Sequence, residues 1–355
     1  MRVTSVLIAM LGFVAAWPGA FAAPASDVST DFRPEVLNIQ PDRIAVAGIS
    51  SGGFMATQLQ LAYPETFPRA AALAGGPYDC FAVAGAMTGC LYPSGLTSDQ
   101  LNAMVSRATR NAGNHLLGDL TQLDHGVFYA LYGTEDEIVG PKIAGSVAAF
   151  YRQLKASLGS QLVDLQVGED GTHDFGHTFP TYLPPLPISN LRVGDNCNKS
   201  VSPFIGRCGF DGAKNILEHL YPDIKTGAQP DGAPGRLTVI PVKSFAPAGG
   251  ASIGDYFYTY TPAACLKGQP CGLLLALHGC NQNDSMVGLA FVRDAGFNRW
   301  ADDYRLIAVY PQTRSTKDNF GGCWDWWGYT GARFDTRDGP QIAWLNRLVT
   351  RLTHR

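Results

Sequence analysis

The sequence predicts an α/β fold with a mostly parallel central sheet and helices on both faces. Two observations lead to this prediction. Short apolar runs typical of buried strands alternate along the chain with amphipathic stretches typical of helices. The 355 residues are 46% hydrophobic and 16% charged, which is enough for a large core and excludes a disordered chain. No repeat or low-complexity linker divides the chain, and a length of 355 residues leaves the number of domains open, because α/β folds often exceed the roughly 150 residues of a typical domain.

In the first half of the chain, a short strand leads directly into a helix that Pro64 ends, because proline lacks the N–H that a helix interior needs. A proline-rich stretch, 180–200, is expected to be a long surface loop. The expected strands of this half are 43–47, 70–74, 127–132 and 162–167, and the expected helices are 54–62 and 143–158.

The second half opens with two runs of period-2 alternation, 237–245 and 256–260, which predict an antiparallel edge of the sheet. The chain closes with a helix at 341–352. Its start is marked by Pro340, and its apolar residues fall on one face. Between these segments we expect a buried strand at 273–277, a helix at 292–302 and a strand at 306–310.

Residues 1–22 have the pattern of a signal peptide. Arg2 is followed by an apolar run at 6–16 and by Ala20-Phe21-Ala22, a small-x-small cleavage site. The alternative is a membrane anchor, but a spanning helix needs about 20 apolar residues and this run is shorter. We therefore expect an exported protein, secreted or periplasmic after cleavage, with no membrane partner.

The charge balance argues against a nucleic-acid partner. Lys and Arg number 27 and Asp and Glu number 30, for a net charge of -3, and no basic cluster is present.

Eight cysteines, an even number, indicate disulfides in an exported chain. Three pairs are near neighbours in the sequence, which leaves one long bridge, although eight cysteines allow 105 pairings. A metal site is the competing interpretation, but no CxxC spacing occurs. The neighbouring pairs are Cys80 with Cys90, Cys197 with Cys208 and Cys265 with Cys271, and the remaining pair is Cys280 with Cys323.

A candidate nucleophile lies between the first expected strand and helix. Gly48-Ile49-Ser50-Ser51-Gly52 matches G-x-S-x-G, in which the serine sits on a strained strand-to-helix turn. The neighbours two residues away on either side crowd each other there, and glycine relieves the crowding. Only Ser50 has glycine at both of those positions, so Ser50 and not Ser51 is the candidate. The alternative is an ordinary Gly/Ser turn.

A serine nucleophile needs a histidine base and an acid that orients it, and in hydrolases built on such a sheet the order is serine, acid, histidine. The loop after 127–132 offers Glu135, Asp136 and Glu137, and the loop after 162–167 offers His173 and His177. From the residues alone, these choices stay open. Asp124-His125 precedes a strand and is expected to be surface turn chemistry, and His115, His219 and His354 are expected to face solvent.

Leu277-His278-Gly279-Cys280 ends an apolar strand and resembles the H-G-x turn whose backbone N–H binds a developing oxyanion. That turn normally precedes the nucleophile, whereas here it follows. The closing helix likewise resembles the helix that usually leads into the nucleophile strand. Joining the two termini would restore the usual order, so we infer a circular permutation.

Two further interpretations concern the neighbourhood of this turn. Cys280 could be a cysteine nucleophile paired with His278, but a disulfide to Cys323 would prevent this. Such a disulfide would bring the segment 324–329, rich in tryptophan, to the oxyanion turn. We therefore expect one tryptophan to form a wall of the substrate cleft, although dense aromatics are more often core.

Together these motifs resemble a known family. The stretches "GISSGGFMATQLQLAYPETF", "AGGPYDC", "YGTEDEIVGP", "GHTFPT", "ALHGCNQ", "WADDYRLIAVYPQ" and "GCWDWWGY" resemble the single-domain, circularly permuted extracellular poly(3-hydroxybutyrate) depolymerases over nearly the whole mature chain. The resemblance implies an α/β-hydrolase fold and hydrolysis of polyester ester bonds without a metal or other cofactor. It implies a single catalytic domain over residues 23–355, and we expect a monomer that acts on a polyhydroxyalkanoate surface or on oligomers.

The resemblance also implies residue roles. The nucleophile maps to Ser50, the acid to Asp136 and the base to His177. The oxyanion donors map to the backbone N–H groups of Ser51 and Cys280, and a substrate-stacking tryptophan maps to Trp324. The family's disulfides resemble the four pairs given above. The sequence departs from the family pattern in the extra Glu135, Glu137 and His173.

Two alternatives to a depolymerase remain. One is a carboxylesterase that acts on a feruloyl or short-acyl ester, because this fold hosts many substrates. The other is a non-catalytic exported binding protein on a hydrolase scaffold. Nothing in the sequence resembles a separate polymer-binding domain, so adsorption to a polymer would use exposed apolar residues of the domain itself.

Overall fold

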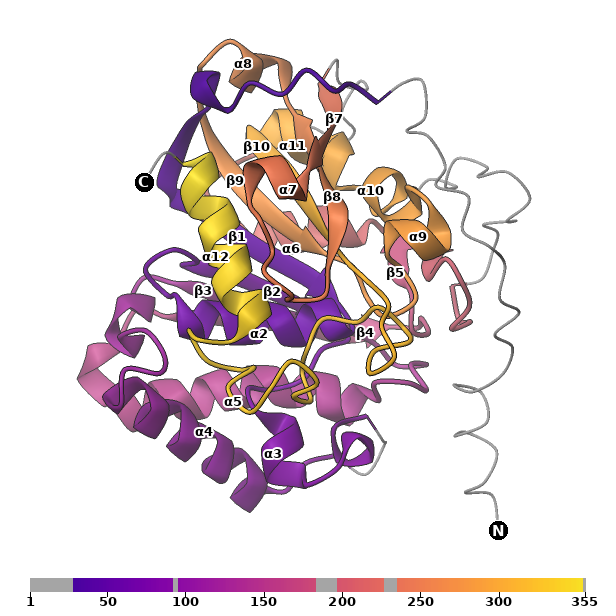
Figure 1. The fold of residues 1–355 in the computed structure, drawn as a ribbon. Helices are drawn as coiled ribbons and strands as arrows, with labels where there is room; N and C mark the ends of the chain where they lie inside the picture. Colours follow the sequence, from indigo (N-terminus) through magenta and orange to yellow (C-terminus); the bar gives the residue numbers. More distant parts are fainter. Residues whose placement is uncertain (1–27, 92–94, 183–196, 227–234, 354–355) are drawn as a thin grey trace.

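The computed structural model describes residues 28–91, 95–182, 197–226 and 235–353. Within them, a central eight-stranded sheet has the strand order β4-β3-β2-β1-β9-β10-β8-β7 (Figure 1). Pairing is parallel from β4 to β10, and β8 is antiparallel to both of its neighbours. The predicted fold class, α/β with a mostly parallel sheet and an antiparallel edge, is confirmed. The strands are β1 (Asn38–Ile49), β2 (Arg69–Leu73), β3 (Val127–Gly133), β4 (Gln166–His173), β7 (Arg236–Pro241), β8 (Ile253–Thr261), β9 (Pro270–Leu277) and β10 (Leu306–Thr313).

The middle strands carry continuous apolar runs because helices cover both faces of the sheet. Helices α2 (Ser51–Ala62), α5 (Pro141–Leu158) and α12 (Pro340–Leu352) cover one face, and α6 (Gly212–Leu220) and α11 (Phe297–Tyr304) cover the other (Figure 1). The other helices are α3 (Cys80–Ala84), α4 (Ser98–Gly113), α7 (Val242–Phe245), α8 (Ala263–Leu266), α9 (Asp284–Val287) and α10 (Ala290–Asp294), with 3-10 turns at Pro34–Val36, Met87–Cys90, Leu120–Leu123 and Gly159–Gln161.

The register of β1 places two turns side by side. Gly48 of β1 pairs with Leu277 of β9, and Ile49 of β1 pairs with Leu73 of β2. Because β1 and β9 are parallel neighbours that end at the same level, the turn after each leaves the sheet at the same edge. We call this the carboxyl edge, and the opposite one the amino edge. The inferred circular permutation is a relation between this chain and other hydrolases, and it stays a prediction.

Several expected elements differ from the structure. The strand expected at 162–167 lies at Gln166–His173, so that His173 ends a strand and does not lie in a loop. The error has a physical cause: β4 is an edge strand, half exposed, and its polar residues carry no apolar run. The helix expected at 292–302 is two short helices, because Gly296 adopts a φ of +96° between them.

Other differences concern the ends of elements. The strand expected at 237–245 ends at Pro241, which cannot donate to a ladder, and continues as α7. The loop expected at 180–200 begins as strand β5 (Phe179–Thr181), which pairs in parallel with β6 (Ile205–Arg207). Residues 183–196 of that loop and the expected signal peptide, residues 1–22, lie outside the described residues. Helices α4 and α6 were not assigned from the sequence.

Four disulfides join Cys80 to Cys90, Cys197 to Cys208, Cys265 to Cys271 and Cys280 to Cys323. These are the pairs that sequence neighbourhood and the family resemblance indicated. A disulfide removes Cys280 as a thiol, so the cysteine-nucleophile interpretation is wrong.

Among the described residues, no helix combines the length and apolarity needed to cross a bilayer.

Candidate active site

Ser50 lies at the tip of the turn between β1 and α2. Its φ of 56° and ψ of -123° belong to a region that non-glycine residues rarely adopt, at a cost of roughly 1–3 kcal/mol. A Cβ on Gly48 would lie 2.4 Å from the carbonyl carbon of Gly52, and a Cβ on Gly52 would lie 2.4 Å from the carbonyl oxygen of Leu277. Both glycines are therefore required for the turn to form against β9, as the crowding argument predicted.

Asp136 and His177 form a buried pair at the same edge. Nδ1 of His177 lies 2.8 Å from Oδ2 of Asp136, and the side chains are 6% and 0% exposed. Oδ1 of Asp136 accepts hydrogen bonds from the backbone N–H groups of Ile138 (2.8 Å) and Val139 (2.9 Å). The carboxylate is thus held in place to accept a hydrogen bond from Nδ1–H of His177, which leaves Nε2 as the basic nitrogen.

The structure separates the acids and histidines that the sequence left as alternatives. Glu135 and Glu137 are exposed, whereas Asp136 between them is buried. His173 pairs instead with Asp170, its Nε2 3.2 Å from Oδ2, and its ring stacks on that of Phe210. The buried arrangement of an acid with a histidine forms at Asp136 and His177. The other histidines considered, His115 and His219, are exposed, and His354 lies outside the described residues.

The turn after β9 packs directly on Ser50. A Cβ on Gly279 would lie 3.1 Å from the Cβ of Ser50. Within the described part of the chain, the backbone N–H groups of Ser51 and Cys280 have no hydrogen-bond partner. Ser51 is the first residue of α2, where a helix leaves its N–H groups unpaired. Two free donors next to a strained serine can bind an oxygen that develops negative charge.

His177 is linked to this turn through Phe204 and Gln282. The ring of Phe204 lies edge-on to the ring of His177, with centroids 6.5 Å apart. The carbonyl of Phe204 accepts a hydrogen bond from Nε2 of Gln282, which follows the turn. No hydrogen bond between Ser50 and His177 occurs among the described residues, and such bonds often close only when substrate is bound.

Trp324 differs from the expectation of a cleft wall. Its side chain is fully buried, with the ring 5.5 Å from that of His278, so no face is open for stacking. Its contact with the site is through the backbone, because its N–H donates to Oγ of Ser51 at 3.3 Å. The hydroxyl of Ser51 is therefore engaged in holding the tryptophan segment.

Asp325 organises this segment, although it was not among the residues expected to form the site. Burial raises the pKa of its carboxyl group, while hydrogen bonds from the following residues lower it in part. The signal in the sequence was an aspartate directly ahead of a tight aromatic and glycine turn, a common place for a side-chain cap of backbone N–H groups. Its donors are the backbone N–H groups of Trp327, Gly328, Tyr329 and Thr330 and the hydroxyl of Thr330.

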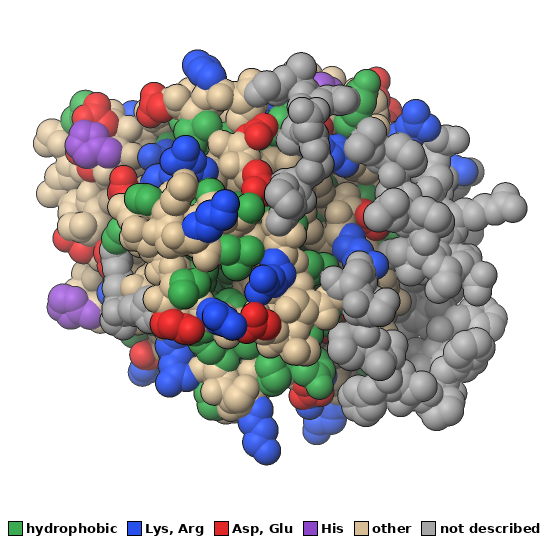
Figure 2. All heavy atoms as spheres, turned by 90° about the horizontal axis from the view of Figure 1, so that it is seen from above, with side chains coloured by type: hydrophobic (Ala, Val, Ile, Leu, Met, Phe, Trp, Pro, Cys, Tyr) green, Lys and Arg blue, Asp and Glu red, His purple; other side chains and the backbone are tan. Residues whose placement is uncertain are grey.

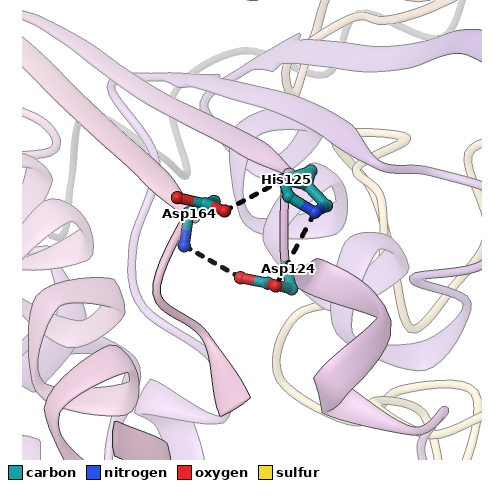
Figure 3. Close-up of side chains that lie close together, drawn as sticks. All are labelled: Asp124, His125 and Asp164. Atoms are coloured by element: carbon teal, nitrogen blue, oxygen red, sulfur yellow. Dashed lines mark hydrogen bonds and ion pairs between the residues drawn. The ribbon is translucent and has the colours of Figure 1, made fainter. Parts of the chain in front are cut away.

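One described cluster has the composition of a metal site, but it lies at the amino edge. Nδ1 of His125 is 3.3 Å from Asp164, and Nε2 is 3.9 Å from Asp124 (Figure 3). Each ring nitrogen of His125 faces a different carboxylate, so a single cation could bind only one of the two nitrogens. The carboxylate of Asp124 is already engaged, because it accepts a hydrogen bond from the backbone N–H of Asp164. These exposed ion pairs fit the surface-turn expectation for Asp124-His125.

Acidic and basic side chains are interspersed on the face that Figure 2 draws. On that face no continuous basic stripe of the kind that binds nucleic acid is present.

Comparisons with known proteins give close relatives. No protein-family model matches the chain. It is 34% identical to the polyhydroxybutyrate depolymerase of Talaromyces funiculosus over 339 residues, 91% of this chain and 92% of that protein. It is 30% identical to the poly(3-hydroxybutyrate) depolymerase of Delftia acidovorans over 89% of this chain, but it spans only 61% of that protein.

Solved structures of PHB depolymerases have a similar fold. The fold is similar to that of the PHB depolymerase from Penicillium funiculosum, with 30% identity and a TM-score of 0.75, over 90% of this chain and 98% of that one. A serine-to-alanine variant of a PHB depolymerase complexed with R3HB trimer gives a TM-score of 0.76 at 30% identity, with the same coverage.

Proposed function

The chain belongs to the polyhydroxybutyrate depolymerase family, and on this premise we propose that it is a serine hydrolase that cleaves the ester bonds of poly(3-hydroxybutyrate) or related polyhydroxyalkanoates. The observation that carries the proposal is the buried pair of Asp136 and His177 at the same sheet edge as the strained Ser50. A buried carboxylate that orients an imidazole is what serine activation requires.

The proposed reaction is a two-step acyl transfer. His177 takes the proton of the Ser50 hydroxyl as the oxygen attacks the ester carbonyl, and Asp136 stabilises the imidazolium that forms. The backbone N–H groups of Ser51 and Cys280 bind the tetrahedral oxyanion. His177 then protonates the departing alcohol, and water releases Ser50 by the same route. No step needs a metal or other cofactor.

The proposal includes the cellular location and the mode of substrate contact. Signal-peptide cleavage would place the enzyme in the periplasm or the medium, as a monomer, where its four disulfides are stable. Exposed apolar side chains near the site would touch a solid polymer. Phe320 is 73% exposed and lies three residues before Cys323. Val201 is also exposed, and it follows Ser200, whose hydroxyl accepts a hydrogen bond from the backbone N–H of His177.

Clearing of a poly(3-hydroxybutyrate) emulsion by the purified protein tests the function. Ser50→Ala should lower turnover by about 10⁴ to 10⁶, since the nucleophile is lost. Ser51→Ala is the matched control and should retain most activity, because the proposed role of Ser51 is its backbone N–H. Equal loss in both variants would mean that the nucleophile is misplaced. Hydrolysis of a soluble short ester without clearing would favour the carboxylesterase alternative.

A further inference from the structure

The oxyanion turn (residues 278–282) is fixed at two successive peptide groups. Nδ1 of His278 lies 2.7 Å from the carbonyl oxygen of Gly279, and the N–H of Gly279 donates to Oε1 of Gln282 at 2.8 Å. The Gly279 carbonyl belongs to the same peptide plane as the N–H of Cys280. In a trans peptide these two groups point in opposite directions, so holding the carbonyl on one side aims the N–H to the other.

His278 can hold that carbonyl only with a proton on Nδ1. Its Nε2 lies within reach of the backbone N–H of Thr313, at 3.3 Å, and so is the accepting nitrogen. Complete burial lowers the pKa of His278 to about 4, so the ring is neutral at ordinary pH with its one proton on Nδ1. The imidazole is thus a fixed donor and takes no part in proton transfer.

Gln282 connects the oxyanion turn to the loop beside His177. Its Nε2 donates to the carbonyl oxygens of Pro203 (3.0 Å) and Phe204 (3.1 Å). Its amide has one possible orientation, because two carbonyls require the NH₂ group and the Gly279 N–H requires the oxygen. The side chain is 1% exposed, so these bonds are shielded from water.

The loop that Gln282 holds is itself strained. Phe204 has a φ of +58°, unusual for a bulky residue, and its ring lies edge-on to His177. The buried side chain of Gln282 is therefore hydrogen-bonded both to the oxyanion turn and to Phe204, the residue that packs against His177.

We propose that Gln282 is a positioning residue that keeps the oxyanion N–H of Cys280 and the imidazole of His177 in register, with His278 fixing the other side of the same peptide. The inference rests on the proposed function, because it takes the Cys280 N–H as an oxyanion donor. Loosening that donor weakens binding of the transition state more than binding of the ester.

The test compares Gln282→Met with Gln60→Met. Methionine matches glutamine in length and removes all three bonds of Gln282. Gln60 is the matched control, because it is also buried and its Nε2 also donates to two carbonyls, those of Pro68 and Val127, at the amino edge. Kinetics on a soluble short ester are normalised by active-site titration with an organophosphate, and affinity for a boronic acid, which forms a tetrahedral adduct with the serine, is measured alongside.

We expect Gln282→Met to lower kcat by about 10- to 100-fold with KM within about threefold, and to weaken boronate binding by a similar factor. Gln60→Met should change neither quantity. Equal kcat in the two variants would overturn the proposal. If Gln282→Met does not fold, Gln282→Asn replaces it: the shorter amide reaches one side only, so kcat should still fall, and an unchanged kcat would again overturn the proposal. Full activity of Ser50→Ala would instead refute the proposed function.

Discussion

Beyond each end of strand β3 an aspartate faces a histidine, and the two pairs differ in distance and in burial. At the amino edge, Asp124 and His125 are 3.9 Å apart, and the histidine side chain is 78% exposed. At the carboxyl edge, Asp136 and His177 are 2.8 Å apart, and the histidine side chain is 6% exposed. The residue types are the same, so composition alone does not identify the catalytic pair.

The difference is in what surrounds the carboxylates. Asp136 accepts two backbone N–H groups besides His177, which fixes its orientation inside the protein. Exposed pairs such as that of Asp124 are worth about 0–1 kcal/mol, because water and salt screen them. Buried, fully bonded polar groups therefore mark this active site better than clusters of charge do, and they gather where parallel strands end.

The largest difference in kcat is expected between replacements of the aspartate at the two ends of β3. Asp136→Asn should lower kcat by about 10⁴, because an amide that donates toward Nδ1 favours the wrong histidine tautomer. Asp124→Asn should leave kcat unchanged. The measurement is turnover of a soluble short ester at neutral pH. A loss below about tenfold in Asp136→Asn would show that another acid, such as Glu135 or Glu137, orients the base.

The disulfides at the two ends of β9 offer a second comparison between the two edges of the sheet. Cys280 and Cys323 are 43 residues apart in sequence, and Cys265 and Cys271 are 6 apart. Loop-closure entropy then predicts a loss of about 4 kcal/mol of unfolding free energy for the first pair replaced by alanine, and about 2 kcal/mol for the second. Only the first replacement should also reduce kcat, since Cys280 carries an oxyanion donor. Denaturant unfolding and ester kinetics test both. An equal effect on kcat would mean that the oxyanion turn does not depend on its disulfide.

The sequence predicted those site residues whose role depends on neighbours only a few positions away. Glycines two residues from Ser50 and an acid directly after β3 are visible in a short window of sequence. Gln282 and Asp325 were not found, because a buried amide or carboxylate is defined by its acceptors and donors, and Gln282 bonds to a carbonyl 79 residues away. The bounds of strand β4 were predicted wrongly and the burial of Trp324 was not predicted, for a related reason: edge position and packing depth are properties of the assembled sheet.

Two buried groups near the carboxyl edge should respond to pH with opposite sign. The pKa of His278 is lowered by burial from 6.5 to about 4, so as pH falls through this range the unfolded chain gains a proton that the folded chain does not bind, and stability falls. The pKa of Asp79 is raised from 3.8 to about 7 by burial and by the neighbouring Asp335, against the opposing effect of Arg107. The folded chain then keeps a proton that the unfolded chain has lost, so stability falls as pH rises.

These two contributions oppose each other between about pH 4 and 6.5, and single variants should reveal each one. The unfolding free energy of Asp79→Asn relative to wild type should rise with pH by up to about 1.4 kcal/mol per unit. That of His278→Asn relative to wild type should fall with pH by a similar amount. Urea unfolding at half-unit pH intervals measures both slopes. Slopes of the same sign in the two variants would contradict the assigned protonation states.

The smallest effect is expected at the exposed end of β3. His125→Asn removes both ion pairs of the cluster with Asp124 and Asp164, yet it should change the unfolding free energy by less than about 1 kcal/mol and leave kcat unchanged. Dialysis against a chelator should likewise leave the activity and the thermal midpoint unchanged, since the proposed reaction uses only side chains and backbone N–H groups. A lower midpoint after chelation in wild type but not in His125→Asn would show that the amino edge holds a stabilising cation. The contrast between the two ends of β3 would then be one between a structural site and a catalytic one.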